Sequence, residues 1–323
     1  MFVTATRRKF LKLSAAGGGA LAGVSGFWVA TSQRRIARWL RTIIADSRRS
    51  VQPAPVKPNP AAWPDNAVTI GWLGHATTLI NFYGIRILLD PVFFTRVGID
   101  VLIGTAGPKR YIAPALSIRE LLPIDVILLS HAHMDHMDLP SLSRFPKQTF
   151  TVTAAKTTDI VQGLNFQNLH EMRWNDKQIF KGRQGDLEIE AVEVRHWGKR
   201  FPNEKIDRGY NGLILRREGK TLLIGGDTAN TPLFAAMRSK GPFDAAIMPI
   251  GAYNPWIRSH CTPEEAVAMA NAADARYIVP IHHSTFKLSD EPMTEPLERV
   301  KQALHREPER LTIQRVGETF TLT

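Results

Sequence analysis

The chain has 323 residues, of which 44% are hydrophobic and 22% charged, a composition typical of a globular protein rather than a disordered or fibrous one. Its net charge of +11 is uneven, because residues 1–50 hold ten basic residues and one acidic residue. Residues 51–323 are nearly neutral, which argues against a nucleic-acid partner. The single cysteine, Cys261, excludes an intrachain disulfide and a cysteine-based zinc site. Any metal must therefore be held by histidines and carboxylates.

The first 33 residues have the pattern of an export signal. The run from Thr6 to Lys12, with Arg7-Arg8 at its centre, resembles the twin-arginine signal. Eighteen uncharged residues follow from Leu13 to Ala30, and their five glycines make them a weak candidate for a membrane-spanning helix. We expect residues 1–33 to use the twin-arginine export machinery and to place the protein in the periplasm or cell envelope, with the segment either cleaved or kept as an anchor.

Residues 34–66 are expected to connect this signal to the folded domain. Over residues 34–45, apolar side chains recur at helical spacing and arginines fill the other positions. Such a basic amphipathic helix suits an anionic membrane surface, and packing on its own domain is the alternative. Five prolines between residues 53 and 64 predict an extended linker, so the folded domain should cover residues 67–323.

The body of the chain predicts an α/β fold with two sheets. Strands are predicted at 68–74, 77–82, 85–89, 125–130, 149–153, 213–216, 221–224 and 277–281, with hairpins over 179–194 and 311–322. A helix over 262–272 begins with the favourable sequence Thr-Pro-Glu-Glu. The long segment 91–116 has little periodicity, so we expect it to form a wall of the substrate site. Two runs of strands separated by helices suit two packed sheets covered by helices.

A dense group of metal-ligand residues follows the apolar run at 126–129. The segment 130–136 contains His131, His133, Asp135 and His136. Imidazole and carboxylate groups in this density suit a borderline divalent cation such as zinc. A solvated histidine loop is the alternative, but it does not explain why the group directly follows a buried strand. The segment lacks the glutamate of the helical HExxH arrangement.

This His-x-His-x-Asp-His signature resembles that of the metallo-β-lactamase superfamily, whose fold is a four-layer αββα sandwich with metals bound between two sheets. The resemblance implies one metal held by His131, His133 and His196, a second held by Asp135, His136 and His282, and Asp227 bridging them. Taken alone, His196 fits a packed core histidine and Asp227 fits a helix cap. We prefer His282 to His283 because an extended chain points neighbouring side chains in opposite directions.

Further runs resemble the N-acylphosphatidylethanolamine-hydrolysing phospholipase D branch and its bacterial relatives. They lie at 71–77, 89–93, 107–110, 196–200, 226–228, 263–267 and 281–286. The resemblance implies a zinc-dependent phosphodiesterase in which about two zinc ions hold a hydroxide nucleophile between them. Asp135 would orient that nucleophile, and His260 would contact or protonate the leaving group or support a ligand. His75 and Asp90, at strand ends, would hold the ligands in orientation.

Four basic residues are candidates for contacts to a substrate phosphate: Lys109, Arg110, Lys199 and Arg200. Loop cations are also commonly just solvated, and that reading stays open. A phospholipid or other small phosphodiester is the expected substrate, bound by an enzyme associated with the membrane. The alternatives are a lactonase-like hydrolase of a small soluble substrate, a nuclease, which the near-neutral body disfavours, and a non-catalytic, metal-stabilised binding module.

Overall fold

The structure, a computed structural model, describes residues 46, 48–101, 104–121, 123–201 and 203–322. The predicted export signal and the predicted helix over 34–45 lie outside these residues. The chain divides into two compact units, Met1–Arg49 and Ser50–Thr323. Little of the first unit is described, although the Arg49 guanidinium lies 2.8 Å from the Asp46 carboxylate. None of the helices in the described parts has the length and hydropathy needed to cross a membrane.

One sheet of the second unit is built around four antiparallel strands and extended by three parallel ones. Its strands are β1 (Val68–Gly74), β2 (Thr77–Phe82), β3 (Ile85–Leu89), β6 (Val126–Leu128), β7 (Phe150–Ala154), β8 (Leu169–Met172) and β15 (Thr319–Leu322). Their spatial order is β15-β1-β2-β3-β6-β7-β8. Strands β3 and β6 are parallel with Leu89 opposite Leu128, so the residues that follow them emerge at the same edge.

The other sheet has the order β14-β13-β12-β11-β10-β9. Its strands are β9 (Lys177–Gly182), β10 (Gly185–Val192), β11 (Gly212–Arg217), β12 (Lys220–Ile224), β13 (Phe243–Pro249) and β14 (Ala275–Ile281). Strands β12, β13 and β14 are parallel, with Ile224 opposite Ile247 and Pro249 opposite Ile281. The chain segments after β12 and β14 therefore meet at one edge, as the segments after β3 and β6 do.

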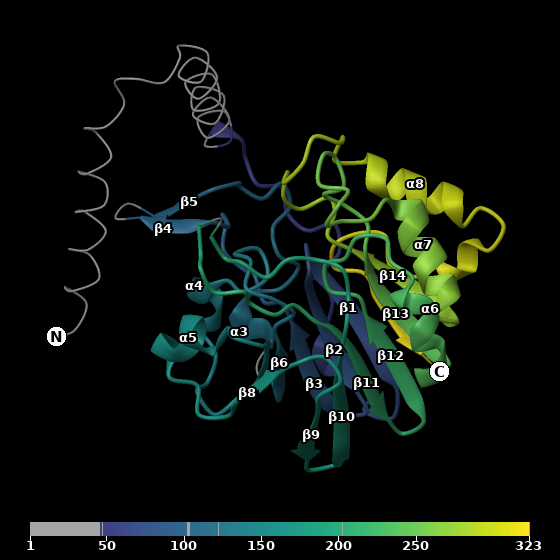
Figure 1. The fold of residues 1–323 in the computed structure, drawn as a ribbon, viewed down its shortest axis with the longest axis horizontal. Coiled ribbons are helices and arrows are strands. Elements are labelled where there is room, and N and C mark those ends of the chain that lie inside the picture. Colours follow the sequence, from purple (N-terminus) through teal and green to yellow (C-terminus); the bar gives the residue numbers. More distant parts are fainter. Residues whose placement is uncertain (1–45, 47, 102–103, 122, 202, 323) are drawn as a thin grey trace. The chain divides into compact units, whose positions relative to one another are not determined.

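Helices cover the outer faces of both sheets. They are α3 (Ile118–Leu121), α4 (Leu139–Leu142), α5 (Thr158–Val161), α6 (Leu233–Met237), α7 (Pro263–Ala272) and α8 (Glu295–Ala303). Figure 1 shows α6, α7 and α8 against the sheet that contains β12–β14, and α3, α4 and α5 beside β6 and β8. Buried side chains from both sheets form one core between them, and a second core lies under the α6–α8 layer. The predicted αββα sandwich is confirmed.

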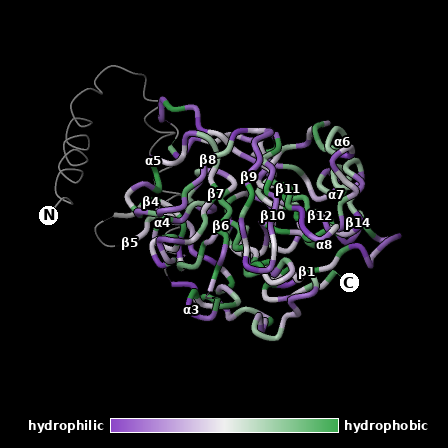
Figure 2. The backbone as a smooth tube through the Cα atoms, turned by 90° about the horizontal axis from the view of Figure 1, so that it is seen from below, coloured by the Kyte–Doolittle hydropathy of each residue, from purple (hydrophilic) through white to green (hydrophobic). Residues whose placement is uncertain are grey.

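Hydrophobic residues concentrate on the strands, as the green parts of the tube in Figure 2 show. Every residue of β1 is buried, because one face meets the other sheet and Trp63 lies across Gly71 on the outside. A Cβ on Gly71 would approach the Trp63 ring to 2.9 Å, so only glycine lets the indole lie this close. Burying the apolar surface of such strands is the main stabilising contribution to the sandwich.

The proline-rich segment that was expected to be a linker packs on the folded domain. The Gln52 N–H donates to the Tyr111 carbonyl over 2.8 Å, and the Val56 N–H donates to the Val316 carbonyl over 3.3 Å. Pro60 is buried and begins a short 3-10 turn, Pro60–Ala62. The compact unit accordingly begins at Ser50.

The strand predictions are confirmed except at the end of the chain. Residues 311–316 do not form a hairpin with β15, which instead pairs with β1 so that Val68 lies opposite Leu322. A single bridge joins Leu311 to Ile278 of β14. The loop over 91–116 contains a small hairpin, β4 (Ile99–Val101) and β5 (Gly104–Ala106), that local periodicity did not indicate.

Candidate metal centre

The predicted metal ligands all follow strand ends at the edge where the two sheets meet. His131, His133, Asp135 and His136 follow β6, His196 follows β10, Asp227 follows β12, and His282 follows β14. At this edge, three strands are each followed by a residue with a left-handed backbone: His75 (φ 54°) after β1, Asp90 (φ 40°) after β3 and His282 (φ 65°) after β14. Such non-glycine conformations are uncommon and cluster at functional sites. Here they turn each side chain inward from the end of its strand.

One group of ligand atoms comes from His131, His133, His196 and Asp227. The His133 Nδ1 lies 2.8 Å from the His131 Nε2 and 3.2 Å from the His196 Nε2. The Asp227 Oδ2 lies 3.9 Å from the His131 Nε2 and 3.8 Å from the His196 Nε2. Three imidazole nitrogens and one carboxylate oxygen therefore converge on one point, as the sequence predicted.

A second group comes from Asp135, His136, His282 and also His75. The Asp227 Oδ2 lies 3.1 Å from the His136 Nε2 and 3.3 Å from the His282 Nε2, so this carboxylate faces both groups. The Asp135 Oδ2 lies 3.4 Å from the His282 Nε2 and 2.9 Å from the His75 Nε2. His75 thus contacts the Asp135 carboxylate directly and holds it in place.

The hydrogen bonds around Ser130 assign the tautomers of two ligand histidines. The Asp90 carboxylate accepts hydrogen bonds from the Ser130 N–H, the Ser130 hydroxyl and the His136 Nδ1–H, at 2.8, 2.7 and 2.8 Å. Because the Ser130 hydroxyl donates its only proton to Asp90, its oxygen accepts a hydrogen bond from the His131 Nδ1–H at 2.9 Å. His131 and His136 therefore both present an Nε2 lone pair to the centre.

The same tautomer is assigned to His196 by a backbone group. The His196 Nδ1–H donates to the Ser259 carbonyl over 2.8 Å, which leaves its Nε2 lone pair facing inward. Within the described residues, the buried His136 Nε2, His282 Nε2 and Asp227 Oδ1 have no hydrogen-bond partner. Buried lone pairs that face one another repel unless a cation lies among them, so the donor set fits divalent metal ions.

Burial and neighbouring charges give histidines of the two groups different pKa values. Burial, the largest cause, lowers the pKa of His133 to about 4 and holds the pKa of His131 and of His196 well below the usual value. Burial would do the same to His282, but the Asp227 and Asp135 carboxylates outweigh it and raise its pKa to about 9. The carboxylates therefore attract positive charge, which is the condition for exchanging a proton for a metal ion.

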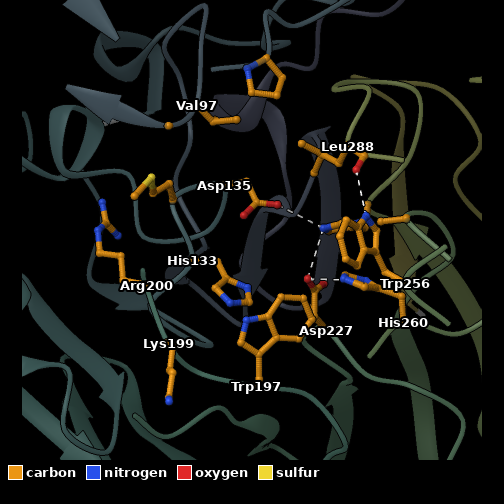
Figure 3. Close-up of a pocket in the computed structure, with 15 residues that line it drawn as sticks. Val97, His133, Asp135, Trp197, Lys199, Arg200, Asp227, Trp256, His260 and Leu288 are labelled. Atoms are coloured by element: carbon orange, nitrogen blue, oxygen red, sulfur yellow. Dashed lines mark hydrogen bonds and ion pairs between the residues drawn. The ribbon is translucent and has the colours of Figure 1, made fainter. Parts of the chain in front are cut away.

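The two groups form the floor of a cavity of about 540 Å³. Its walls come from the loop over 91–116, which the sequence assigned to the substrate site, and from the loops before α7 and after β10. Apolar and aromatic side chains form most of these walls: Val97, Pro108, Met134, Trp197, Ala252, Trp256 and Leu288. Figure 3 shows Asp227 between Trp197 and Trp256, with His133 beside Trp197 and Asp135 above them.

The four basic residues expected near a phosphate occupy different environments. Lys199 and Arg200 line the cavity, whereas Lys109 and Arg110 are not among its lining residues. Arg200 donates to the carbonyls of Ala132 and Met137 at 2.7 and 2.9 Å, so it clamps the loop that carries the metal ligands.

Arg110 differs most from its expected role. Its side chain is buried, with 1% of its surface exposed, and its Nη2 donates to the Val92 carbonyl over 2.8 Å. Its guanidinium also lies over the Phe286 ring, 4.9 Å from the centroid. The structure therefore places Arg110 in the support of the loop rather than at the substrate.

Two further histidines lie at the edge of the centre. The His260 Nδ1 is 3.9 Å from the Asp227 Oδ2, and His260 lines the cavity. Burial lowers the pKa of His260 to about 4. His283 faces away, as expected: its ring stacks on Trp72 at 4.4 Å and its Nδ1 lies 2.8 Å from the Ser284 hydroxyl.

Comparison with known proteins agrees with this geometry. A family model described as "Beta-lactamase superfamily domain" matches residues 85–283, which include all seven predicted metal ligands. The chain belongs to the metallo-β-lactamase superfamily. It is a metal-dependent hydrolase of this fold.

Three known proteins show how this metallo-β-lactamase-fold chain relates to others. It is 30% identical to N-acyl-phosphatidylethanolamine-hydrolyzing phospholipase D 1 of Caenorhabditis elegans over 247 residues, covering 72% of this chain and 68% of the relative. It is 29% identical to an uncharacterised protein of Mycobacterium tuberculosis over 90% of this chain and 78% of that protein. The crystal structure of isothiocyanate hydrolase from Delia radicum gut bacteria has a TM-score of 0.63 at 19% identity, covering 78% and 98%.

Some residues of the metallo-β-lactamase site carry no signal in the sequence. Ser130 links Asp90 to His131, yet a serine beside a histidine motif is ordinary. Trp256 and Leu288 meet at the cavity, where the Trp256 Nε1–H donates to the Leu288 carbonyl over 3.3 Å, although 32 residues separate them in the chain. Trp197 directly follows a predicted ligand, so its position was the one available hint for an aromatic wall.

Proposed function

We propose that this hydrolase is a zinc-dependent phosphodiesterase of the phospholipase D type that acts on N-acylphosphatidylethanolamine-like lipids. The observation that carries the proposal is a charged metal centre at the floor of a cavity whose walls are apolar and aromatic. A phospholipid has this same division, since its phosphodiester is charged and its acyl chains are apolar. The similarity to the C. elegans enzyme supports the same substrate class.

The chain's own residues supply binding, orientation and proton handling. Two zinc ions, when bound, acidify a water molecule and neutralise the charge of the phosphate. His131, His133 and His196 would hold one ion and Asp135, His136 and His282 the other, with Asp227 shared between them. His75, through its 2.9 Å contact, keeps the Asp135 carboxylate directed at the centre.

Lys199 and His260 are the residues proposed to contact the substrate. Lys199 lines the cavity and offers an ammonium group to a non-bridging phosphate oxygen. His260 also lines the cavity and faces Asp227, but no described group fixes its Nδ1 as Ser130, Asp90 and Ser259 fix the Nδ1 of His131, His136 and His196. We assign it to the leaving group, at which a neutral imidazole donates a hydrogen bond through its N–H.

The location of the enzyme is part of the proposal. The twin-arginine-like signal in residues 1–33 supports export to the periplasm or cell envelope, and the basic amphipathic pattern over 34–45 supports attachment to an anionic membrane. A lipid substrate requires such a location because the substrate itself resides in the membrane.

The test is a pair of measurements on the purified full chain: metal content, and hydrolysis of vesicles containing N-acylphosphatidylethanolamine beside bis(p-nitrophenyl) phosphate. About two zinc ions per chain and zinc-dependent release of phosphatidate would support the proposal. Hydrolysis of the soluble phosphodiester without any action on vesicles would contradict the lipid assignment. Activity on a small lactone alone would favour a lactonase, and absence of metal after reconstitution would overturn the centre itself.

A further inference from the structure

Exposed large hydrophobic side chains concentrate around the mouth of the cavity. The described residues include eight with substantial exposure: Ile99, Trp174, Ile179, Trp197, Phe201, Ile206, Trp256 and Ile257. Trp197 and Trp256 line the cavity, and Ile99, Phe201 and Ile257 each directly follow a residue that lines it. Five of the eight therefore lie on three loops that contribute to the cavity lining.

The loops that carry these side chains are held together. The His196 Nδ1–H donates to the Ser259 carbonyl, which ties the loop after β10 to the loop before α7. The Trp197 and His260 rings lie 6.0 Å apart across the same junction. In Figure 3, Arg200 and Trp256 lie on opposite sides of the cavity, and Phe201 and Ile257 are the residues that directly follow them in the chain.

Exposing large apolar side chains to water is unfavourable. A hydrogen bond nevertheless holds at least one of them in its exposed orientation. Trp256 is 52% exposed and Ile257 is 46% exposed. The Trp256 indole N–H donates to the Leu288 carbonyl, so its ring is oriented by the protein while half of its surface meets solvent. Tryptophan with one apolar face and one satisfied N–H is typical of membrane interfaces.

The charges beside the rim select the kind of partner. Basic groups on and next to these loops are Arg195, Lys199, Lys205, Arg258 and Lys287, and the exposed carboxylates described there are Glu193, Asp207 and Asp290. Glu204 is engaged by Arg208 at 3.0 Å. An apolar rim with an excess of cations complements an anionic phospholipid surface, because acyl chains take the apolar groups and headgroup phosphates take the cations.

We propose that the rim formed by Ile99, Trp197, Phe201, Trp256 and Ile257 docks on an anionic phospholipid bilayer and places the cavity mouth against the lipid headgroups. This inference rests on the proposed lipid substrate, and it goes further by assigning a membrane contact to the hydrolase domain itself. The predicted amphipathic helix would tether the chain, whereas the rim would orient the active site.

Site-specific labelling tests this docking without depending on turnover. The only cysteine, Cys261, is buried with 1% exposure, so a new surface cysteine can be labelled selectively. We would label full-length Phe201→Cys and Ile257→Cys with nitrobenzoxadiazole, an environment-sensitive fluorophore. Ile179→Cys is the matched control, because Ile179 is 41% exposed but lies on β9, an edge strand that contributes nothing to the cavity lining.

The expected result is a blue shift and a several-fold rise in emission at positions 201 and 257 on phosphatidylglycerol-containing vesicles, with little change at 179. Phosphatidylcholine vesicles should give a weaker response. Equal responses at all three positions would indicate unspecific adsorption and overturn the proposal. Co-sedimentation of the protein with vesicles but no response at 201 or 257 would assign binding to the amino-terminal region alone, which also overturns it.

Two further measurements distinguish docking on lipid from self-association of the chain and from a loss of catalysis. A response that rises with protein concentration in the absence of vesicles would show that a second copy of the chain covers the rim, which contradicts docking on lipid. In unlabelled protein, Phe201→Ser with Ile257→Ser should weaken vesicle binding about tenfold, because each side chain has about two-fifths of its surface left to bury. Hydrolysis of bis(p-nitrophenyl) phosphate should be unchanged, so docking and chemistry fail separately.

Discussion

Replacing Asp90 with asparagine should weaken metal binding although Asp90 touches no metal. The Asp90 Oδ2 accepts from both the Ser130 hydroxyl and the His136 Nδ1–H, and its Oδ1 accepts from the Ser130 N–H. An amide has the same shape and tolerates the left-handed backbone at this position. However, its NH₂ group must face either the Ser130 N–H, which cannot turn away, or the Ser130 hydroxyl and the His136 Nδ1–H together, and in the second orientation both donors lose their acceptor.

The reorientation reaches both metal positions. If Ser130 turns its hydroxyl proton towards His131, that ring takes the opposite tautomer and its Nε2 no longer offers a lone pair. If the His136 ring takes the opposite tautomer instead, its Nε2 no longer offers a lone pair to the second metal position. Loss of such an orienting partner lowers metal affinity about 10- to 100-fold, or roughly 1.4 to 2.8 kcal/mol. We therefore expect Asp90→Asn to lose affinity by this factor.

The assay is a competition titration of metal-stripped full-length protein against a chromophoric chelator, with the unfolding transition followed by circular dichroism. Asp125→Asn is the matched control, since the Asp125 Oδ2 accepts from the Arg86 N–H over 2.8 Å and Asp125 precedes β6, at the opposite end of that strand from the ligands. It should keep wild-type affinity. Wild-type affinity in Asp90→Asn would refute the tautomer argument, and equal losses in both variants would point to general destabilisation.

Two other predictions concern the metal centre and the ion pairs of Glu190. Asp227→Ala should abolish metal retention and turnover together, whereas His260→Ala should lower turnover with metal content kept; equal metal loss, measured by elemental analysis, would remove the separate role of His260. Burial opposes ionisation of Glu190, but Lys240 and Arg216 outweigh it and hold the pKa of Glu190 below its usual value. These ion pairs stabilise the fold at pH values above the usual glutamate pKa, and this stabilisation is lost as the pH falls. The Glu190→Gln variant should therefore unfold more easily at pH 7, and its stability should depend less on pH in the acid range.

The sequence singles out residues 130–136 because a strand end followed by closely spaced histidines and a carboxylate is a local pattern. Residues 130–136 need only one strand, β6, to bring four ligand side chains to the sheet edge. Asp227 and His282 follow β12 and β14, which are joined in parallel through β13; because β13 was not among the predicted strands, these two residues were singled out by the family resemblance. Local patterning therefore indicated the ligands at 130–136 alone.

The pairing of strands that lie far apart in the sequence could not be predicted in the same way. The terminal strand β15 has two partners of similar composition available, residues 311–316 beside it and β1 some 250 residues away. The distant partner is chosen because β1 has an open side at which Val68 to Gly71 meet Thr319 to Leu322. Nothing in the local sequence shows that open edge, since it exists only after the sheet has formed.

The basic residues show a different limit of the sequence. Arg200 and Lys199 are neighbours and both looked suited to a phosphate, yet only the structure distinguishes them. The carbonyls of Ala132 and Met137 are acceptors on either side of the ligand histidines, and a planar guanidinium reaches both through one nitrogen. An ammonium group on a flexible stem has no such fixed geometry, so Lys199 stays available to a ligand. An arginine beside a metal motif is thus as well suited to hold the loop as to bind a substrate, and the acceptors in reach decide which it does.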